Sequence, residues 1–208
     1  MDRNGDTQCY SERFETRAEA AVLFAAGFRH PALQMLRREC EHLDVAAGPK
    51  AWTMLFEACH LLGERDEFDR LAVRYRESFG AVSAPRWGYA AAVEAPGTAR
   101  LAGILASMED LKDLVESAKS RKTVAIDFSR VERIDFAFAP TLCALFRTYG
   151  MQGKRIILAN IAELHAELLH SVGIGPHVAL LRRRLLDHEA ANVAPNASND
   201  ERAEAAAA

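Results

Sequence analysis

The chain has 208 residues, of which 50% are hydrophobic and 26% are charged, and its formal net charge is −3 at pH 7. This composition is typical of a folded protein with one or two domains, and the weak acidity gives no indication of nucleic-acid binding. No stretch approaches the ~20 apolar residues that a membrane span needs, and residues 1–14 lack the apolar core of a signal peptide. We therefore expect a cytoplasmic protein that neither inserts directly into a membrane nor binds nucleic acid.

The residues that commonly bind metals are scattered or badly spaced. The four cysteines form no CxxC pair, and they are Cys9, Cys40, Cys59 and Cys143. The last three are interpreted as small core residues with reduced thiols. His165 and His170 are five positions apart, so they do not share one helix face as a metal-binding pair would. With Glu163 and Glu167 they are interpreted as a solvated helix surface, and we expect no metal and no cofactor.

Helical periodicity runs through residues 12–80. The four apolar stripes begin at Ala18, Leu33, Trp52 and Phe68. Gly27 and Gly63 each break a helix pair, and their spacing is close to the ~34-residue period of tetratricopeptide repeats. The segment from Ala51 to Trp87 resembles such a repeat, and a plain four-helix bundle is the alternative. In either case we expect binding rather than chemistry, because helical hairpins of this kind present grooves.

Residues 81–87, which include Ser83 and Pro85, are interpreted as a linker. After them, residues 89–94 and 98–105 are predicted to form two strands around a Pro96-Gly97 turn. The other predicted elements are a helix over 108–120, a helix over 162–172, a strand over 178–181 and the start of a final helix over 182–186. Arg182-Arg183-Arg184 in that last helix is interpreted as a solvated basic face.

The stretch from Lys122 to Ile161 has the pattern of a strand, a helix and a second strand. Val124 to Phe128 and Ile156 to Ala159 are short apolar runs of strand length. The residues at helical spacing between them are Leu142, Leu145, Phe146 and Tyr149, and Gly150 and Gly153 follow as stop signals. Such a unit predicts two parallel strands joined by a right-handed crossover.

This pattern resembles the STAS family, the domain of anti-sigma-factor antagonists and of the cytoplasmic ends of sulfate transporters. The residues that carry the resemblance are Ile126-Asp127-Phe128-Ser129, Val131, Ile134-Asp135, Glu167-Leu168-Leu169 and Val172-Gly173-Ile174. It covers about residues 88–186 and implies an α/β fold with a STAS-like mixed sheet and helices. A small all-α helical-hairpin domain would precede it. The expected domains are 12–80 and 88–187, followed by a disordered tail over 188–208.

The chain departs from the family pattern at one functional position. In antagonist-type members the aspartate that matches Asp135 is followed by Ser or Thr, a small residue and Gly. That hydroxyl is phosphorylated by a partner kinase, at a helix N-terminus that stabilises negative charge. This chain has Phe136, Ala137 and Phe138 there. The resemblance therefore implies a docking surface whose usual switch cannot operate.

Several side chains around this position have alternative interpretations. Asp127 and Asp135 could act as an acid–base pair, but fixing a strand-end loop and satisfying N–H groups near a helix start are favoured. Ser129 and Thr141 are the nearest hydroxyls that could accept a phosphate instead, which is not favoured. Two aromatics in an exposed loop would anchor a partner, whereas the alternative packs them under the N-terminal helices. The predicted partner-binding residues are Asp135, Phe136, Ala137, Phe138 and Thr141.

The leading functional hypothesis is a non-enzymatic bacterial adaptor that regulates by protein–protein contact. The resemblance implies a protein partner such as a regulator, a kinase-like anti-sigma factor or a transporter subunit, and a homodimer is also open. One alternative is a STAS domain that binds a nucleotide, against which the lack of a Gly-rich phosphate loop counts. Another is a structural subunit of a membrane-associated transport or signalling complex. Fold analogy alone does not decide among these.

Overall fold

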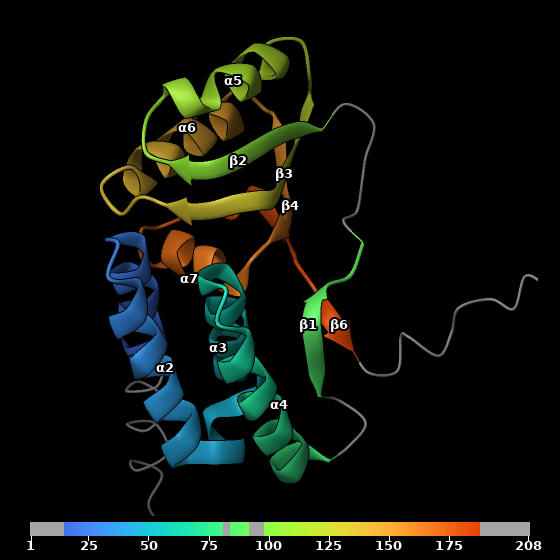
Figure 1. Cartoon of the computed structure of the whole chain (residues 1–208). Coiled ribbons are helices and arrows are strands. Elements are labelled where there is room, and N and C mark those ends of the chain that lie inside the picture. The colour runs from blue at the N-terminus through green and yellow to red at the C-terminus, as the bar shows by residue number, and fades with distance from the viewer. Residues whose placement is uncertain (1–14, 81–83, 92–97, 188–208) are drawn as a thin grey trace, which may run out of the picture.

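The computed structural model describes residues 15–80, 84–91 and 98–187, and it begins with a helical part (Figure 1). Residues 15–25 are helical, and they are followed by α2 (Arg29–Leu43), the short 3-10 helix η1 (Asp44–Ala47), α3 (Gly48–Leu62) and α4 (Arg65–Phe79). Gly27 and Gly63 have φ values of +91° and +75°. Glycine adopts this left-handed backbone at little cost, which is why helices end there. The predicted N-terminal helical region and both helix breaks are confirmed.

An α/β part follows, with four strands in one sheet. The strands are β2 (Ala99–Leu105), β3 (Thr123–Ile134), β4 (Arg155–Ile161) and β5 (Val178–Arg182), in spatial order β2-β3-β4-β5. Every neighbouring pair is parallel, and Val124 of β3 lies opposite Ile156 of β4. The predicted βαβ unit and the α/β fold class are confirmed. The antiparallel pairing of the structure lies in a separate ribbon.

Helices cover the sheet and connect it to the helical part. They are the 3-10 helix η2 (Glu109–Leu111), α5 (Lys112–Ala118), α6 (Ala139–Met151) and α7 (Glu163–Ser171). Figure 1 shows α5 and α6 at the end of the molecule away from α2–α4, whereas α7 lies between the strands and these helices. Helix α7 contacts α3 directly. The α3–α7 interface therefore joins the two parts.

Two predictions about the strands were wrong. β1 (Pro85–Tyr89) pairs antiparallel with β6 (Leu185–Asp187) in a two-stranded ribbon, so β1 and β2 form no hairpin. The predicted final helix over 182–186 is instead the end of β5 and the start of β6. The Trp87 ring packs against His60 at 4.7 Å and Phe68 at 5.3 Å between ring centroids, which holds β1 against α3 and α4. Part of the predicted 81–87 linker is thus strand, and the predicted Pro96-Gly97 turn lies outside the described residues.

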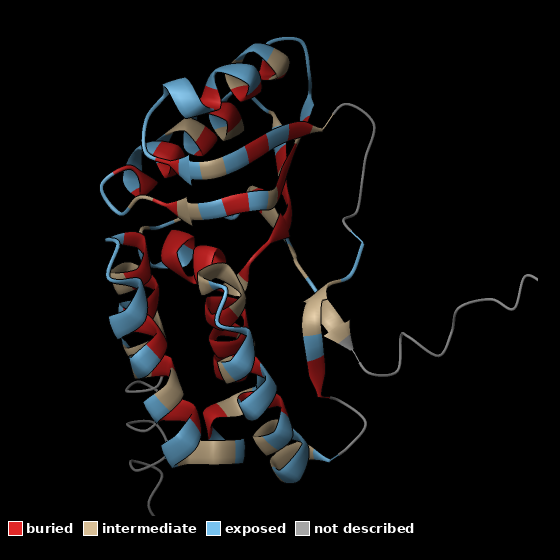
Figure 2. Cartoon of the chain, in the orientation of Figure 1, coloured by how far each residue is buried: buried red, intermediate tan, exposed pale blue. Residues whose placement is uncertain are grey.

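One hydrophobic core runs through both parts. It includes Trp52 and Phe56 of the helical part, Phe128 and Phe146 of the α/β part, and Leu164 of α7 between them. Figure 2 shows buried residues along the sides of α3 and α7 that face each other. The thiols of Cys40, Cys59 and Cys143 are free and buried, as predicted, and Cys9 lies outside the described residues. Division into independent domains at 12–80 and 88–187 stays a prediction, and the predicted tail over 188–208 is not described.

Candidate functional site

Of the predicted partner-binding residues, Asp135, Phe136, Ala137 and Phe138 lie in the loop that joins β3 to α6, and Thr141 lies in the first turn of α6. The Asp135 N–H donates to the Leu105 carbonyl at 2.8 Å, and the Asp135 carbonyl accepts from Ala139 N–H at 2.9 Å. The Asp135 side chain accepts from the Ala137 N–H at 3.0 Å. Asp135 therefore satisfies backbone donors just before the helix, as the sequence indicated. Because these bonds fix the loop at both ends, a partner would meet a preorganised surface.

The helical part supports this loop from one side. The Phe136 N–H donates to the Ala25 carbonyl at 3.3 Å. The same carbonyl accepts a bond of 2.5 Å from Nη1 of Arg133, which also lies 3.2 Å from Oδ2 of Asp135. Gly27 faces Arg133 too, since a Cβ added at Gly27 would lie 3.7 Å from Nη1. The turn between the first helix and α2 is therefore bound to the base of the loop.

The two phenylalanines of the loop have different environments. The Phe136 side chain is exposed at 41% of its possible area, whereas Phe138 is exposed at 7% and belongs to the hydrophobic core. Ala137 and Thr141 are exposed beside Phe136. The exposed Phe136 ring is free to contact a partner, which stays a prediction, whereas the Phe138 ring is part of the core. The available surface is formed by Phe136, Ala137 and Thr141, with Phe138 as the residue that anchors the loop from below.

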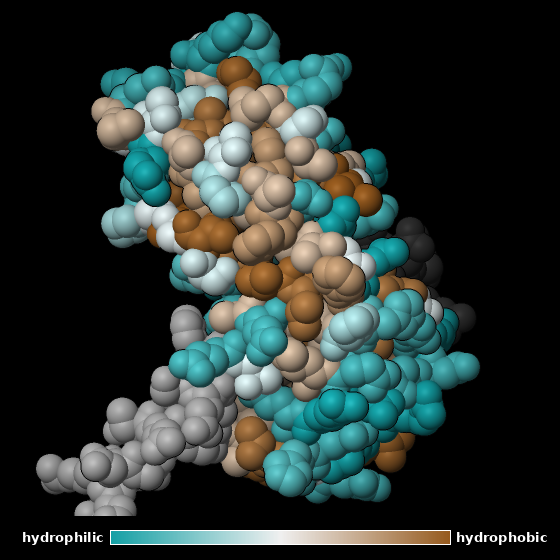
Figure 3. Space-filling model, turned by 90° about the vertical axis from the view of Figure 1, so that its left-hand side faces the viewer, coloured by the Kyte–Doolittle hydropathy of each residue, from teal (hydrophilic) through white to brown (hydrophobic). Residues whose placement is uncertain are grey.

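A second exposed phenylalanine adjoins this loop. Phe28, in the turn that Arg133 binds, is exposed at 58%. Figure 3 shows hydrophobic side chains gathered over the middle of this side of the molecule, between the helical and α/β parts. Exposed aromatics and apolar surface of this kind are typical of protein interaction sites.

The other carboxylate considered from the sequence has a structural role. Asp127 accepts hydrogen bonds from Asn160 Nδ2 at 2.8 Å, from Ser129 N–H at 3.0 Å and from Ser129 Oγ at 2.8 Å. Burial tends to raise the pKa of Asp127, but these bonds and the charge of Arg100 outweigh it and hold the pKa below its ordinary value. Asp127 is thus an ionised, bond-accepting group that joins β3 to β4. Asp135 lies beyond the end of β3 with its own donors, so the two carboxylates form no acid–base pair.

The sequence analysis did not identify the ionisable groups at the α3–α7 interface. Glu57 is fully buried and accepts from the Glu163 N–H at 2.6 Å and the Leu164 N–H at 3.3 Å, at the start of α7. Burial raises the pKa of Glu57 to about 8. Lys50 lies 3.3 Å from Glu163 and also pairs with Glu167. Glu57 interrupts the apolar run of α3 in the sequence, and this interruption could have indicated a buried carboxyl group.

The prediction that these α7 side chains form a solvated face is therefore wrong for His165 and Glu167. His165 is exposed at 2% and Glu167 at 1%, because α3 and the first helix cover this side of α7. Burial lowers the pKa of His165 to about 4, so its ring is neutral at physiological pH. Within residues 15–80, 84–91 and 98–187, no cluster of His, Cys, Asp and Glu could hold a metal ion.

A cavity of about 310 Å³ opens beside this interface. It is lined by His60, Tyr89, Ala90, Ser129, Asn160 and Arg183. Arg183 also lines a second cavity of about 300 Å³, which reaches Trp52 and Tyr75. The basic run was predicted to be a solvated face, but Arg182 pairs with Glu163 at 2.6 Å and Arg183 stacks on the Tyr89 ring. The β1–β6 ribbon draws this run against the helical part.

Comparison with models of protein families found a match in the α/β part of the chain. Residues 90–182 match the family model described as "Mlab, STAS domain". Searches among curated proteins and among solved structures each found no match. No helix in the described part of the chain has the length and apolar character required to cross a membrane. The sequence match and the parallel four-stranded sheet with its helices agree, and both are consistent with a STAS fold for residues 90–182.

Proposed function

We propose that the protein is a non-enzymatic adaptor that binds a protein partner through the surface formed by Phe136 and Ala137 of the loop and Thr141 of α6. The observation that carries this proposal is the exposed Phe136 ring on a loop fixed by hydrogen bonds at both ends. An aromatic side chain on a rigid support loses little conformational entropy when it is buried in a complex. STAS domains generally act in regulation and interaction, and the chemistry of the loop agrees with that role.

The partner contact is constitutive with respect to phosphorylation at position 136. Phenylalanine has no hydroxyl, so the charge that would interrupt an apolar contact in antagonist-type members cannot be added there. Thr141 is exposed, has a hydroxyl and lies in the first turn of α6, as an alternative phosphate acceptor that the sequence does not favour. Binding at this surface would therefore depend on the state or the abundance of the partner rather than on phosphorylation at position 136.

The helical part has a supporting role in this function. Its first turn holds the loop through the Ala25 carbonyl, and it adds Phe28 to the same surface. A tetratricopeptide-like groove in α2–α4 would be a separate binding surface. As a subunit of a membrane-associated complex, the protein would present the same loop to a neighbouring subunit.

Site-specific photo-crosslinking tests this proposal. A photoreactive phenylalanine analogue at position 136 is expected to form a discrete adduct with one partner protein in cells. The matched control has the same analogue at Met151, which is exposed at 77% near the opposite end of α6. An adduct of the same size from both positions, or from neither, would contradict docking at the loop.

A further inference from the structure

The cavity beside the α3–α7 interface has the features of a ligand site, and it is separate from the Phe136 loop. Its lining comes from α3, β1, β3, β4 and the residue after β5. Asn160 and Arg183 lie at the carboxyl ends of the parallel strands β4 and β5, where open α/β sheets commonly bind ligands. A volume of about 310 Å³ is at the lower end of the range for small-molecule pockets.

Arg183 brings a cation that the protein leaves poorly compensated. Its guanidinium carbon lies 3.3 Å from the centroid of the Tyr89 ring, and its N–H donates to the Ile161 carbonyl at 2.8 Å. Among the described residues, none accepts a hydrogen bond from the guanidinium itself. Burial lowers the pKa of Arg183, although Tyr89, Glu57 and Asp127 partly oppose the shift. The guanidinium N–H donors of Arg183 are thus half-buried and held in place by the Tyr89 ring, and they are available to a ligand.

The nearby carboxylates do not neutralise this cation fully. Glu57 retains its proton at neutral pH because burial raises its pKa to about 8. Asp127 does not line the cavity, and its carboxylate is already bound by Ser129 and Asn160, which do. His60 is neutral, since burial and the charge of Arg183 lower its pKa. Of the residues that line the cavity, Arg183 carries the charge, and this favours an anionic occupant.

A second hydrogen-bond donor lies beside Arg183. The Tyr89 hydroxyl is buried and has no hydrogen-bond partner among the residues that the structure describes. Burial raises the pKa of this hydroxyl, so it keeps its proton and can donate. A buried donor without a partner is costly, and a ligand oxygen would satisfy it.

We propose that this cavity binds a small molecule through a carboxylate or phosphate group, with the Arg183 guanidinium and the Tyr89 hydroxyl as its donors. Arginine suits either group because its planar fork matches two oxygens at once. The ligand would contact the helical part through His60 and the STAS domain through Ser129 and Asn160. Because it binds both parts of the folded chain, it should also stabilise the fold in proportion to its concentration.

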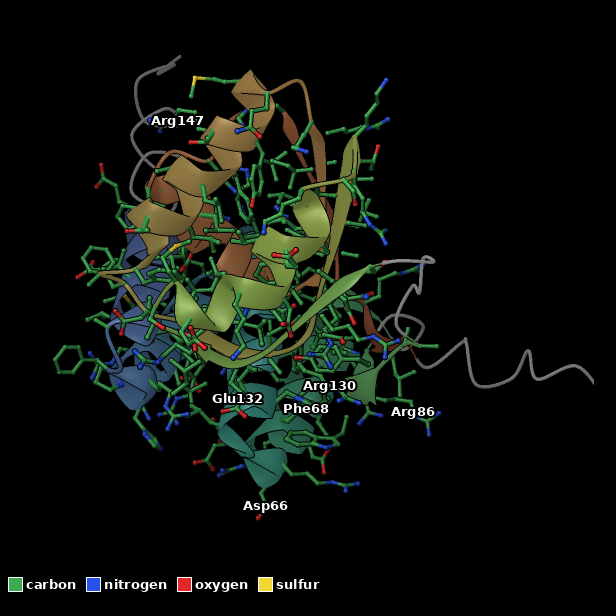
Figure 4. All side chains as sticks on the ribbon, turned by 90° about the horizontal axis from the view of Figure 1, so that it is seen from above. Asp66, Phe68, Arg86, Arg130, Glu132 and Arg147 are labelled. Carbon is green, nitrogen blue, oxygen red and sulfur yellow. The ribbon has the colours of Figure 1, made fainter. Side chains whose placement is uncertain are left out.

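Titration calorimetry with inorganic phosphate and with malonate, at constant ionic strength, tests the proposal on the full chain. Wild-type protein is expected to show saturable binding of at least one probe. Arg183→Gln should weaken it by about tenfold or more, since a hydrogen bond to a charged group is lost. The matched control is Arg86→Gln: Arg86 is also on the ribbon, is exposed, and reaches the periphery of the molecule in Figure 4. That control should bind as wild type does.

Tyr89→Phe gives an independent measure, because it removes only the hydroxyl and keeps the ring under Arg183. It should weaken binding severalfold and leave the melting temperature without ligand nearly unchanged. The probe that binds better distinguishes a phosphate ligand from a carboxylate ligand. The absence of saturable binding for both probes, or equal binding by wild type, Arg183→Gln and Tyr89→Phe, would overturn the proposal. None of these outcomes depends on a partner at the Phe136 loop.

Discussion

Replacing Glu57 by glutamine should change how the stability of the protein depends on pH. Glu57 is fully buried and binds the first N–H groups of α7, and glutamine preserves an oxygen that can accept these bonds. The charge of Glu163 raises the pKa of Glu57 further, whereas the two N–H bonds and the charge of Arg183 lower it. Burial exceeds these contributions, so the folded protein holds a neutral carboxyl at neutral pH.

The size of the effect follows from the two pKa values. The carboxyl has a pKa of 4.5 when unfolded and about 8 when folded. Between these values the folded state binds the proton and the unfolded state releases it, so the free energy of unfolding falls as pH rises. The slope approaches about 1.4 kcal/mol per pH unit, and the loss reaches up to about 5 kcal/mol at the upper end. Below pH 4.5 this contribution is constant.

Urea denaturation at several pH values from 4.5 to 8 measures the slope. The wild-type protein should lose stability with rising pH relative to Glu57→Gln, because glutamine does not ionise. The control is Glu77→Gln on the exposed surface of α4, which should follow the wild-type curve. Parallel curves for wild type and Glu57→Gln would refute the reasoning, since they would show that Glu57 titrates alike in both states.

Two further predictions concern packing. Gly150→Ala should lower the free energy of unfolding by about 1–3 kcal/mol in chemical denaturation, because the added Cβ would lie 2.5 Å from the His177 ring. That ring is held by the hydrogen bond between its Nε2 and the Phe146 carbonyl. Stability equal to wild type would show that the ring moves freely. The fragment 88–187 should still melt cooperatively, but at a lower temperature than the full chain because α7 loses its cover. A fragment without a cooperative melt would contradict an α/β domain that folds independently.

The sequence predicts those parts of the fold that depend on local patterns. The apolar runs of β3 and β4 and the glycines at 27 and 63 are local signals, and the corresponding strands and helix ends are where they were expected. The β1–β6 ribbon joins segments at opposite ends of the α/β part. Its pairing depends on Trp87 packing against α3 and α4, which no local pattern contains.

The candidate sites divide in the same way. Position 136 could be found because a family pattern marks the loop, and the structure shows its ring exposed while that of Phe138 is buried. The cavity around Arg183 could not be predicted from the sequence, because its lining residues come from α3, β1, β3, β4 and the position after β5. These segments are far apart in the sequence. Residue type was misleading for His165 and Glu167, whose burial is caused by the helical part.

The most direct test of the central claim compares partner capture by wild type, Phe136→Ala, Phe136→Asp and the control Met151→Asp, with a thermal melt of each. Truncation of an aromatic anchor commonly costs about 2 kcal/mol or more, which is roughly thirtyfold in affinity. We predict that Phe136→Ala weakens capture to about this extent, that Phe136→Asp nearly abolishes it, and that Met151→Asp captures the partner normally, with melting temperatures close to wild type throughout. Full capture by Phe136→Asp would contradict docking at the loop, and a sharply lowered melting temperature for Phe136→Ala would show that the ring serves the fold instead.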